Sequence, residues 1–353
     1  MVQNNIDKGK ISWQSPSNIA LIKYWGKHGI QLPCNPSVSM TLSTSLTNTS
    51  ISYLKKQHAD KNVFLEFYFD GKRSEAFEKR IAVYFNHILD EFPFLSDYQF
   101  KIESSNTFPH SSGIASSASA FSALALCIIS LKEIVTGEIS KNEFFQQASQ
   151  LARLGSGSAS RSVYGGYTVW GKVEGTDTYS DIYARPLQSE VHPVFQFYQD
   201  AILIVSSKNK KVGSTAGHAL MEKNPFARAR YRQAMDHTIE MLQVLKNGDS
   251  ERLVRIVEQE AMTLHGLMMS SDPGYVLMKQ ETIEIIDLIR DFRKKLQIPV
   301  AFTLDAGPNV HLLYPLISRE KVLNFINEEL LHFCDNRQWI DDAMGKGPQL
   351  MNA

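Results

Sequence analysis

The sequence is poor in cysteine and has no excess of either charge. Its three cysteines, Cys34, Cys127 and Cys334, lie far apart and form no C-x-x-C pair, so we expect neither a disulfide framework nor a zinc site. Lys and Arg together number 37, and so do Asp and Glu. This zero formal net charge gives no support for a protein that binds nucleic acid or a membrane surface. Any recognition of anions must therefore be local.

The first ten residues are polar and lack the apolar stretch of a signal peptide. We expect no apolar run long enough to span a membrane, and hence a soluble cytoplasmic protein. With 43% hydrophobic and 21% charged residues, the chain can bury a sizeable core. Its 353 residues allow two domains, for which we predict the ranges 1–190 and 191–353.

Hydrophobic periodicity predicts β-rich segments first and long helices later, a pattern typical of the α+β class. Ser140 is expected to begin a helix as its N-cap, with Glu143 completing a capping box. Strands are predicted at 19–22, 38–54, 62–69, 98–104, 167–170, 201–206, 300–304 and 310–314. Helices are predicted at 74–89, 116–135, 140–154, 224–246, 250–265, 273–296 and 320–333.

The most informative segment runs from Ser15 to Lys27. An apolar run, Ile19 to Ile22, leads directly into Lys23, and Lys27 follows four residues later. Lysine is rarely buried without a partner, so two lysines at the end of a core strand indicate a place where anions bind. The alternative is that both side chains extend past the strand into solvent.

Two further segments are rich in small residues. Pro109-His-Ser-Ser-Gly-Ile-Ala-Ser-Ser117 runs into an apolar helix, whose first turn offers free N–H groups to a phosphate. It does not match the Walker pattern, and a simple tight turn is the alternative. Gly155-Ser-Gly-Ser-Ala-Ser-Arg161 ends in an arginine suited to bidentate phosphate contacts, or is a plain linker. Asp305, at the end of an apolar strand and before Gly307-Pro308, is either a turn residue or a carboxylate that faces a cleft.

Taken together and in this order, these segments resemble the diphosphomevalonate decarboxylases of the GHMP kinase superfamily. The residues that carry the resemblance are Asn18-Ile-Ala-Leu-Ile-Lys-Tyr-Trp-Gly-Lys27, Leu32-Pro-Cys-Asn-Pro-Ser37, Phe108-Pro-His-Ser-Ser-Gly-Ile-Ala-Ser-Ser-Ala118, Gly155-Ser-Gly-Ser-Ala-Ser-Arg161 with Gly165-Gly166-Tyr167, and Phe302-Thr-Leu-Asp-Ala-Gly-Pro-Asn309. The first and the last of these motifs distinguish the decarboxylases from other GHMP kinases.

The resemblance implies a two-domain α+β fold, with an N-terminal domain like domain 2 of ribosomal protein S5 and a ferredoxin-like C-terminal domain. It implies that ATP and Mg²⁺ are used to phosphorylate the 3-hydroxyl of mevalonate 5-diphosphate, followed by loss of phosphate and CO₂ to give isopentenyl diphosphate. It also implies a homodimer. Nearby alternatives are a decarboxylase of the 5-monophosphate and a 3-kinase that does not decarboxylate. A non-catalytic paralogue is disfavoured because neither Asp305 nor the phosphate loop is lost.

The resemblance also assigns roles to individual residues. Asp305 and Lys23 match the catalytic pair, and Ser117 is a candidate ligand of Mg²⁺. The positions that match substrate contacts are Asn18, Tyr24, Lys27, Ser156, Ser158 and Arg161. The positions that match nucleotide contacts are Asn106, Ser111, Ser112, Gly113, Ser116, Ser117 and Ser214.

Several positions depart from the family pattern. His110 stands in the phosphate loop and has no assigned role, and Pro36 replaces a residue that is usually serine. The family stretch S-S-T-x-G-M is read here as Gly213-Ser-Thr-Ala-Gly-His218. We interpret His265, which lies on a predicted helix beside Leu264, as structural.

Overall fold

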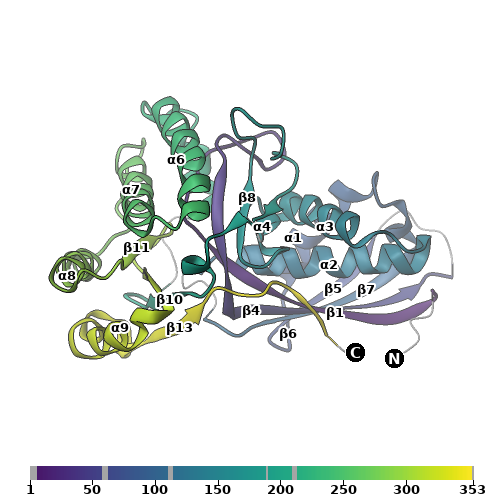
Figure 1. The fold of residues 1–353 in the computed structure, drawn as a ribbon. Coiled ribbons are helices and arrows are strands. Elements are labelled where there is room, and N and C mark those ends of the chain that lie inside the picture. The colour runs from purple at the N-terminus through teal and green to yellow at the C-terminus, as the bar shows by residue number, and fades with distance from the viewer. Residues whose placement is uncertain (1–5, 58–62, 110–113, 188–189, 209–212, 352–353) are drawn as a thin grey trace.

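Two β-sheets, each with helices packed against it, organise the computed structural model, which describes residues 6–57, 63–109, 114–187, 190–208 and 213–351 (Figure 1). The first sheet has the order β14-β1-β4-β7-β5-β6, and β8 and β9 extend it beside β4. Its strands are β1 (Lys8–Ala20), β4 (Ser37–Lys55), β5 (Phe64–Phe69), β6 (Lys72–Arg73), β7 (Tyr98–Asn106), β8 (Tyr167–Trp170), β9 (Arg185–Pro186) and β14 (Gln349–Met351).

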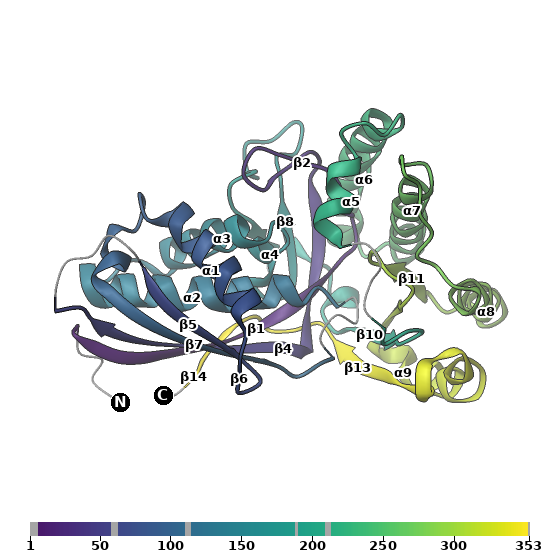
Figure 2. The same ribbon diagram turned by 180° about the vertical axis from the view of Figure 1, so that it is seen from behind.

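One face of this sheet is covered by helices, as Figures 1 and 2 show. They are α1 (Glu75–Ile88), α2 (Ser116–Thr136), α3 (Lys141–Gly155) and α4 (Ala159–Ser162). Ile51 and Ile102 of the sheet, Phe85 of α1 and Ile129 of α2 are completely buried between these layers. Burial of such side chains is the main source of stability, at about 1.5–3 kcal/mol for each.

Helix α2 corrects one of our expectations. By length and composition it is apolar enough to cross a membrane, contrary to the prediction that no run reaches that length. Most of its residues are buried between the sheet and the neighbouring helices. An apolar helix surrounded by protein is a core helix, and α2 is one.

The second sheet has the order β11-β12-β10-β13 and is antiparallel throughout. Its strands are β10 (Tyr198–Leu203), β11 (Ala301–Leu304), β12 (Val310–Pro315) and β13 (Trp339–Ala343). The helices around it are α5 (Ser214–Leu220), α6 (Ala227–Asn247), α7 (Ser250–Met269), α8 (Gln280–Leu296) and α9 (Arg319–Phe325). A short hairpin of β2 (Lys27–His28) and β3 (Leu32–Pro33) follows β1.

The two sheets are joined by a shared core and by polar contacts. Ile19 and Met40 of the first sheet belong to the same buried cluster as Met241 of α6 and Leu313 of β12. Asp342 of β13 accepts hydrogen bonds from successive backbone N–H groups of β4, at 2.7–2.9 Å over residues 43–45. The chain then returns to the first sheet, where β14 pairs with β1. These contacts therefore fix the position of the two halves relative to each other.

The α+β class is confirmed, and most of the predicted elements exist. Ser140 caps α3 by accepting from the N–H of Glu143, although the return bond of a capping box is not formed by the described groups. The strand predicted at 19–22 is the end of a much longer one, since β1 begins at Lys8. It ends at Ala20 rather than at Ile22, because the N–H groups of both Leu21 and Ile22 turn to the carbonyl of Val38.

Other boundaries were also wrong. The helix predicted at 273–296 begins at Gln280, and the strand predicted at 201–206 occupies Tyr198–Leu203. The last predicted helix is regular only over α9 and continues through a π-helical turn, Ile326–Leu330, into a 3₁₀ turn. The segment 155–161 is not all loop, since it ends within α4.

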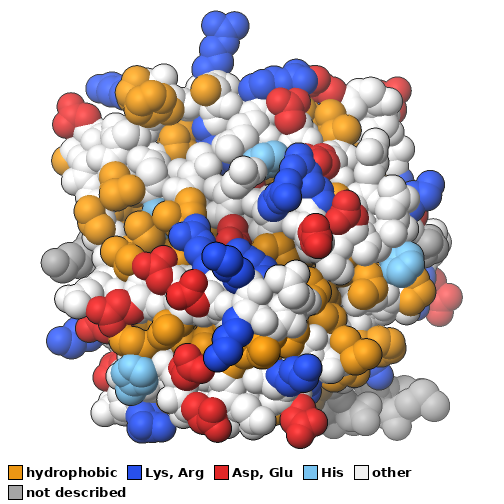
Figure 3. All heavy atoms as spheres, turned by 60° about the vertical axis from the view of Figure 1, so that its left-hand side comes forward, with side chains coloured by type: hydrophobic (Ala, Val, Ile, Leu, Met, Phe, Trp, Pro, Cys, Tyr) orange, Lys and Arg blue, Asp and Glu red, His pale blue; other side chains and the backbone are white. Residues whose placement is uncertain are grey.

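On the face shown in Figure 3, acidic and basic side chains are interspersed. This mixed surface agrees with the zero net charge of the sequence.

Candidate active site

A cavity of about 140 Å³ lies where the two halves meet, and nine residues predicted from the sequence line it. They are Asn18, Lys23, Tyr24, Lys27, Ser117, Ser156, Ser158, Arg161 and Asp305. Segments far apart in the chain supply them, from the end of β1 to the turn after β11. The fold therefore brings the sequence motifs to one place.

Lys23 and Asp305 form an ion pair at the wall of this cavity. The Nζ of Lys23 lies 3.1 Å from Oδ1 of Asp305, and the lysine side chain is only 2% exposed. Burial lowers the pKa of Lys23, and the carboxylates of Asp305 and Glu260 oppose that shift. The ammonium group is thus held against a carboxylate with almost no water around it, which rules out the alternative that Lys23 extends into solvent.

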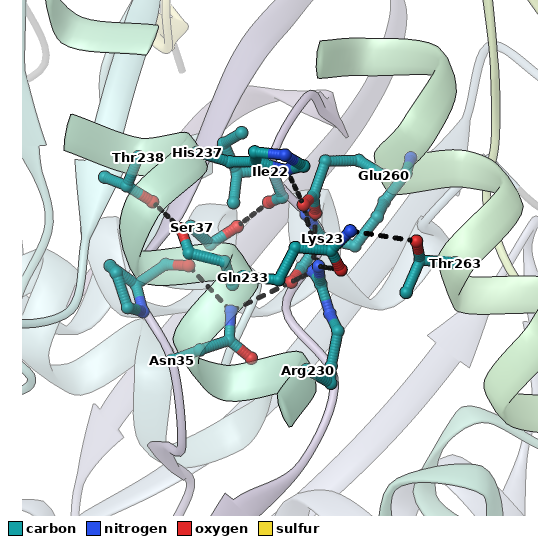
Figure 4. A network of polar contacts seen from close by, with 12 residues as sticks. Ile22, Lys23, Asn35, Ser37, Arg230, Gln233, His237, Thr238, Glu260 and Thr263 are labelled. Carbon is teal, nitrogen blue, oxygen red and sulfur yellow. Dashed lines mark hydrogen bonds and ion pairs between the residues drawn. The ribbon is translucent and has the colours of Figure 1, made fainter. Parts of the chain in front are cut away.

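The backbone of Lys23 is fixed by residues from both halves of the molecule (Figure 4). Its N–H donates to Oε2 of Glu260 at 2.8 Å, and its carbonyl accepts from Arg230 and from Asn35, each at 3.0 Å. Arg230 and Glu260 are themselves a buried bidentate pair, and His237 also donates to Glu260. We call Arg230 and Glu260 the clamp. It connects α6 and α7 to the residue that carries the buried ammonium.

Asp305 stands directly after β11, in a tight turn. The N–H of Gly307 donates to the carbonyl of Asp305 at 2.7 Å, and Nε2 of His265 lies 3.2 Å from the same oxygen. His265 comes from α7 and is buried. Its interpretation as structural agrees with this contact, which braces the backbone of Asp305.

Asn18 is aimed into the cavity by an irregularity in β1. The register between β1 and β4 shifts between Pro16 and Asn18, and such bulges redirect side chains. The Asn18 amide donates to Oγ of Ser162 at 2.7 Å and to the carbonyl of Ser158 at 3.2 Å. Among the described residues, nothing hydrogen-bonds its buried Oδ1. That oxygen can accept a hydrogen bond from a ligand.

Arg161 is a buried cation that forms no ion pair in the described part of the chain, although the charge of Asp305 acts on it from farther away. Its side chain is 2% exposed, donates to Oγ of Ser37 and lies 6.0 Å over the ring of Trp170. Burial lowers the pKa of Arg161 to about 10, so the guanidinium remains charged at neutral pH. An isolated buried charge is costly unless an anion joins it. Arg161 therefore indicates that an anion binds here.

Serine hydroxyls connect the start of α2 with the turn before α4. Ser117 Oγ lies 3.2 Å from Ser156 Oγ, which lies 3.3 Å from Ser158 Oγ. Ser116 and Ser117 are the first residues of α2, where free N–H groups and the helix dipole favour anions. The predicted residues Ser111, Ser112 and Gly113, together with His110, lie outside the described residues, and so does the side chain of Ser214.

Tyr24 and Lys27 line the same cavity. The Tyr24 hydroxyl is buried without a hydrogen-bond partner among the described residues, and burial raises the pKa of Tyr24, so the hydroxyl keeps its proton. Lys27 is half-buried and donates to Gln31 at 3.1 Å. Burial and the nearby Arg80 lower the pKa of Lys27.

A second, mostly apolar cavity of about 90 Å³ adjoins the first, because Ser117 and Arg80 line both. Phe69 and Phe77 contribute rings to it, and the predicted residues Asn106 and Ser116 lie here rather than in the first cavity. Asn106 accepts from Thr47 at 2.8 Å, while its buried amide nitrogen has no partner among the described groups.

Among the residues that line the first cavity, the sequence analysis missed two with ionisable side chains. Arg80 is one of several basic residues on the amphipathic helix α1, and nothing in the spacing distinguishes it. His218 was noted only as a departure from the family stretch, although its ring lies 4.4 Å from that of Tyr24. Its position in the cavity depends on how α5 packs against residues 24–26, which a sequence pattern does not show.

Comparisons with known proteins agree on one family. Residues 15–183 match the diphosphomevalonate decarboxylase-like N-terminal domain, and residues 201–350 match the mevalonate 5-diphosphate decarboxylase C-terminal domain. The diphosphomevalonate decarboxylase of Ganoderma lucidum is 29% identical over 334 residues, which cover 88% of this chain and 80% of the relative.

Solved structures extend the match to the fold. The mevalonate diphosphate decarboxylase of Staphylococcus aureus superposes with a TM-score of 0.82 at 29% identity, over 98% of both chains. A structure described as MDDEF in complex with MVAPP, AMPPCP and magnesium gives a TM-score of 0.80 at 26% identity, over 98% of this chain and all of the other. These matches confirm the expected two-domain α+β architecture, and because both halves match one enzyme family in order, the chain belongs to the diphosphomevalonate decarboxylase family.

Proposed function

We propose that this chain catalyses the ATP-dependent decarboxylation of mevalonate 5-diphosphate to isopentenyl diphosphate, with ADP, phosphate and CO₂ as the other products. The observation that carries the proposal is the buried, unpaired guanidinium of Arg161 in the same cavity as the Lys23–Asp305 pair. The guanidinium of Arg161 suits the binding of a polyanion, and the Lys23–Asp305 pair suits chemistry on a hydroxyl group.

The charges of the cavity fit this substrate. Four cations line it, Lys23, Lys27, Arg80 and Arg161, against one carboxylate, Asp305. A substrate with a carboxylate at one end and a diphosphate at the other would offset this excess of positive charge. We assign the diphosphate to Arg161, Lys27, Tyr24, Ser156 and Ser158. Asn18 is assigned to the region of the substrate carboxylate, where its free Oδ1 would accept from a water molecule bound to that carboxylate.

The Lys23–Asp305 pair would act on the 3-hydroxyl. The carboxylate of Asp305 accepts or orients the hydroxyl proton while the oxygen attacks the terminal phosphorus of ATP and ADP leaves. Lys23 offsets the negative charge that develops nearby. The C3–O bond then breaks, phosphate departs, and the electron pair of the bond to the carboxylate carbon forms the new C2–C3 double bond as CO₂ is released.

The adjoining apolar cavity is a suitable place for the base of the nucleotide. Phe69 and Phe77 would contact the base, Asn106 offers its free amide nitrogen, and Ser116 and Ser117 begin α2 beside the phosphates. The related structure described with AMPPCP and magnesium supports this use of a nucleotide. Within the proposal, the predicted residues Ser111, Ser112, Gly113 and Ser214 also contact the nucleotide.

Mg²⁺ is expected to arrive with the nucleotide. In the described part of the chain no three His, Cys, Asp or Glu residues are grouped to hold a metal. The oxygen of Ser117 fits a hard cation that keeps most of its ligands from water and phosphate. When bound, Mg²⁺ would neutralise phosphate charge.

The function is tested by incubating the purified protein with ATP, Mg²⁺ and either mevalonate 5-diphosphate or the 5-phosphate, while CO₂ and phosphate are measured. Formation of ADP without CO₂ would identify a 3-kinase and refute decarboxylation. Release of CO₂ from the monophosphate alone would change the assigned substrate.

The role of Asp305 has its own test. We expect Asp305→Asn to abolish turnover while ATP still binds, because the amide cannot accept the proton. The matched control is Asp287→Asn on α8, whose side chain is 68% exposed, pairs with Arg290 and does not line the cavity. Turnover by Asp305→Asn at the control's rate would refute the assignment.

For Arg161 we expect a weaker KM for the diphosphate substrate in Arg161→Gln and a smaller loss in Arg161→Lys, which keeps the charge. An unchanged KM in the glutamine variant would remove Arg161 from the substrate site.

Three broader features complete the proposal. We place the protein in the cytoplasm as a homodimer, in keeping with the family. The domain boundary is assigned near residue 190, between the two matched segments that end at 183 and begin at 201.

A further inference from the structure

His218 stands in the wall of the first cavity, where its ring is held between two aromatic neighbours. The ring centroid lies 4.4 Å from that of Tyr24 and 4.6 Å from that of Trp25. The preceding residue, Gly217, permits this approach, because a Cβ atom there would lie 2.6 Å from the Trp25 ring. The side chain is 8% exposed, so the ring has little freedom to turn.

One hydrogen bond fixes which ring nitrogen carries the proton. The backbone N–H of Gly26 points at Nδ1 of His218 over 3.0 Å. A backbone N–H can only donate, so Nδ1 must be the unprotonated nitrogen. A neutral imidazole then carries its proton on Nε2. Gly26 itself has a φ of +96°, and a Cβ there would lie 2.3 Å from the Tyr231 hydroxyl, so this backbone geometry requires glycine.

The second nitrogen is available to a ligand. Among the described residues no group hydrogen-bonds Nε2 of His218, although the residue lines the cavity together with Lys27, Ser158 and Arg161. An N–H donor at a cavity wall that has no protein partner is hydrated until an acceptor atom of a ligand takes the place of the water.

The ring also stays neutral. Burial, followed by the charges of Lys27 and Arg161, lowers the pKa of His218 to about 3. Protonation would moreover place a proton on Nδ1, directly opposite the N–H of Gly26. The cations that act on His218 are those assigned to the diphosphate, whereas Lys23 and Asp305 are not among the groups that shift it.

We propose that His218 is a positioning residue for the substrate, which donates an uncharged hydrogen bond from Nε2 to a phosphate oxygen of mevalonate 5-diphosphate. The inference rests on the proposed function and deepens it. Lys27 and Arg161 already supply charge at this end of the cavity. A neutral donor orients the phosphate group through a directional hydrogen bond, without the free-energy cost of burying a further cation.

The test is steady-state kinetics with two variants. In His218→Met the ring is replaced by a flexible apolar side chain without a donor, and we expect KM for mevalonate 5-diphosphate to rise about tenfold or more, since hydrogen bonds to charged groups are among the stronger ones. We expect kcat to change less than about threefold and KM for ATP to stay unchanged. His218→Gln, which retains an amide donor, should restore part of the loss.

A pH series separates a neutral donor from a charged one. The ratio of KM between His218→Met and the unaltered protein should stay flat from about pH 5.5 to 8.5, because His218 does not titrate there. A ratio that grows as pH falls below about 6.5 would mean that the residue acts as an imidazolium, and would overturn the proposal.

Equilibrium binding distinguishes failure of this inference from failure of the proposed function. Calorimetric titration with inorganic pyrophosphate needs no turnover, and it should show weaker binding to His218→Met than to the unaltered protein. If the protein is inactive but this difference persists, the decarboxylase assignment fails and the role of His218 stands. If the protein is active and both variants keep the normal KM and pyrophosphate affinity, the role of His218 is refuted. Equal losses in both variants, with a lower unfolding temperature, would show a merely structural residue and also refute it.

Discussion

Replacement of Glu260 by glutamine tests how strongly the clamp holds the active site together. The carboxylate is completely buried and accepts from Arg230 at 2.5 and 2.7 Å, from the N–H of Lys23 at 2.8 Å and from His237 at 2.6 Å. Glutamine preserves the shape but removes the charge. The guanidinium of Arg230, 1% exposed, would then be left buried without a counter-charge.

Breaking a buried ion pair from one side costs about 3–5 kcal/mol, because the remaining charge stays desolvated. We therefore expect Glu260→Gln to lose about that much free energy of unfolding, measured by urea denaturation with several probes. The double variant Arg230→Met/Glu260→Leu, which removes both charges, should be more stable than Glu260→Gln.

The matched control lies on the same helix as Arg230. Asp236 pairs with Arg232 at the surface, where both side chains are more than half exposed, so Asp236→Asn should leave the urea midpoint nearly unchanged. If Glu260→Gln is no less stable than this control, the clamp does not contribute as the structure implies.

Three further predictions concern acid, the core and a helix cap. Burial alone would raise the pKa of Glu260, but Arg230 and His237 outweigh it and lower that pKa to about 2. The contribution of the Glu260 carboxylate to the free energy of unfolding is therefore complete above about pH 4.5 and is lost as pH falls towards 2. The difference in stability between Glu260→Gln and the unaltered protein should narrow over that pH range in urea titrations. Ile129→Ala, at a completely buried position of α2, should cost about 2–5 kcal/mol in the same assay, and a loss below about 1 kcal/mol would contradict the packing described. Ser140→Ala removes the side chain that caps α3 and should cost about 1 kcal/mol, whereas an unchanged midpoint would show that the cap is dispensable.

The helices that were predicted correctly are those whose boundaries depend on their own residues and not on distant contacts. Helix α2 is apolar on nearly every side, and α3 carries its cap at Ser140, so both were predicted within about a residue of their observed ends. The motif lysine, Lys23, could be recognised because its charge conflicts with the apolar run before it.

Features that depend on distant partners were not predicted. Glu260 and Arg230 look like surface charges on amphipathic helices, but in the fold they are buried, paired with each other and bonded to the backbone of Lys23 from the other half of the molecule. The helix expected from residue 273 begins at Gln280 because apolar spacing alone does not mark where a chain turns. The position of His218 beside Tyr24 is likewise a result of tertiary packing.

The pairing of β14 with β1 has a consequence for biosynthesis. Ser12, Trp13 and Gln14 leave the ribosome more than 300 residues before their partners at 349–351. Until those residues emerge, this part of β1 presents an open strand edge, which is where unwanted pairing with other chains begins. The first sheet is thus completed only after the second has been made. A chain that ended before residue 349 would keep every residue that lines the active-site cavity, yet it would leave this edge of β1 uncovered.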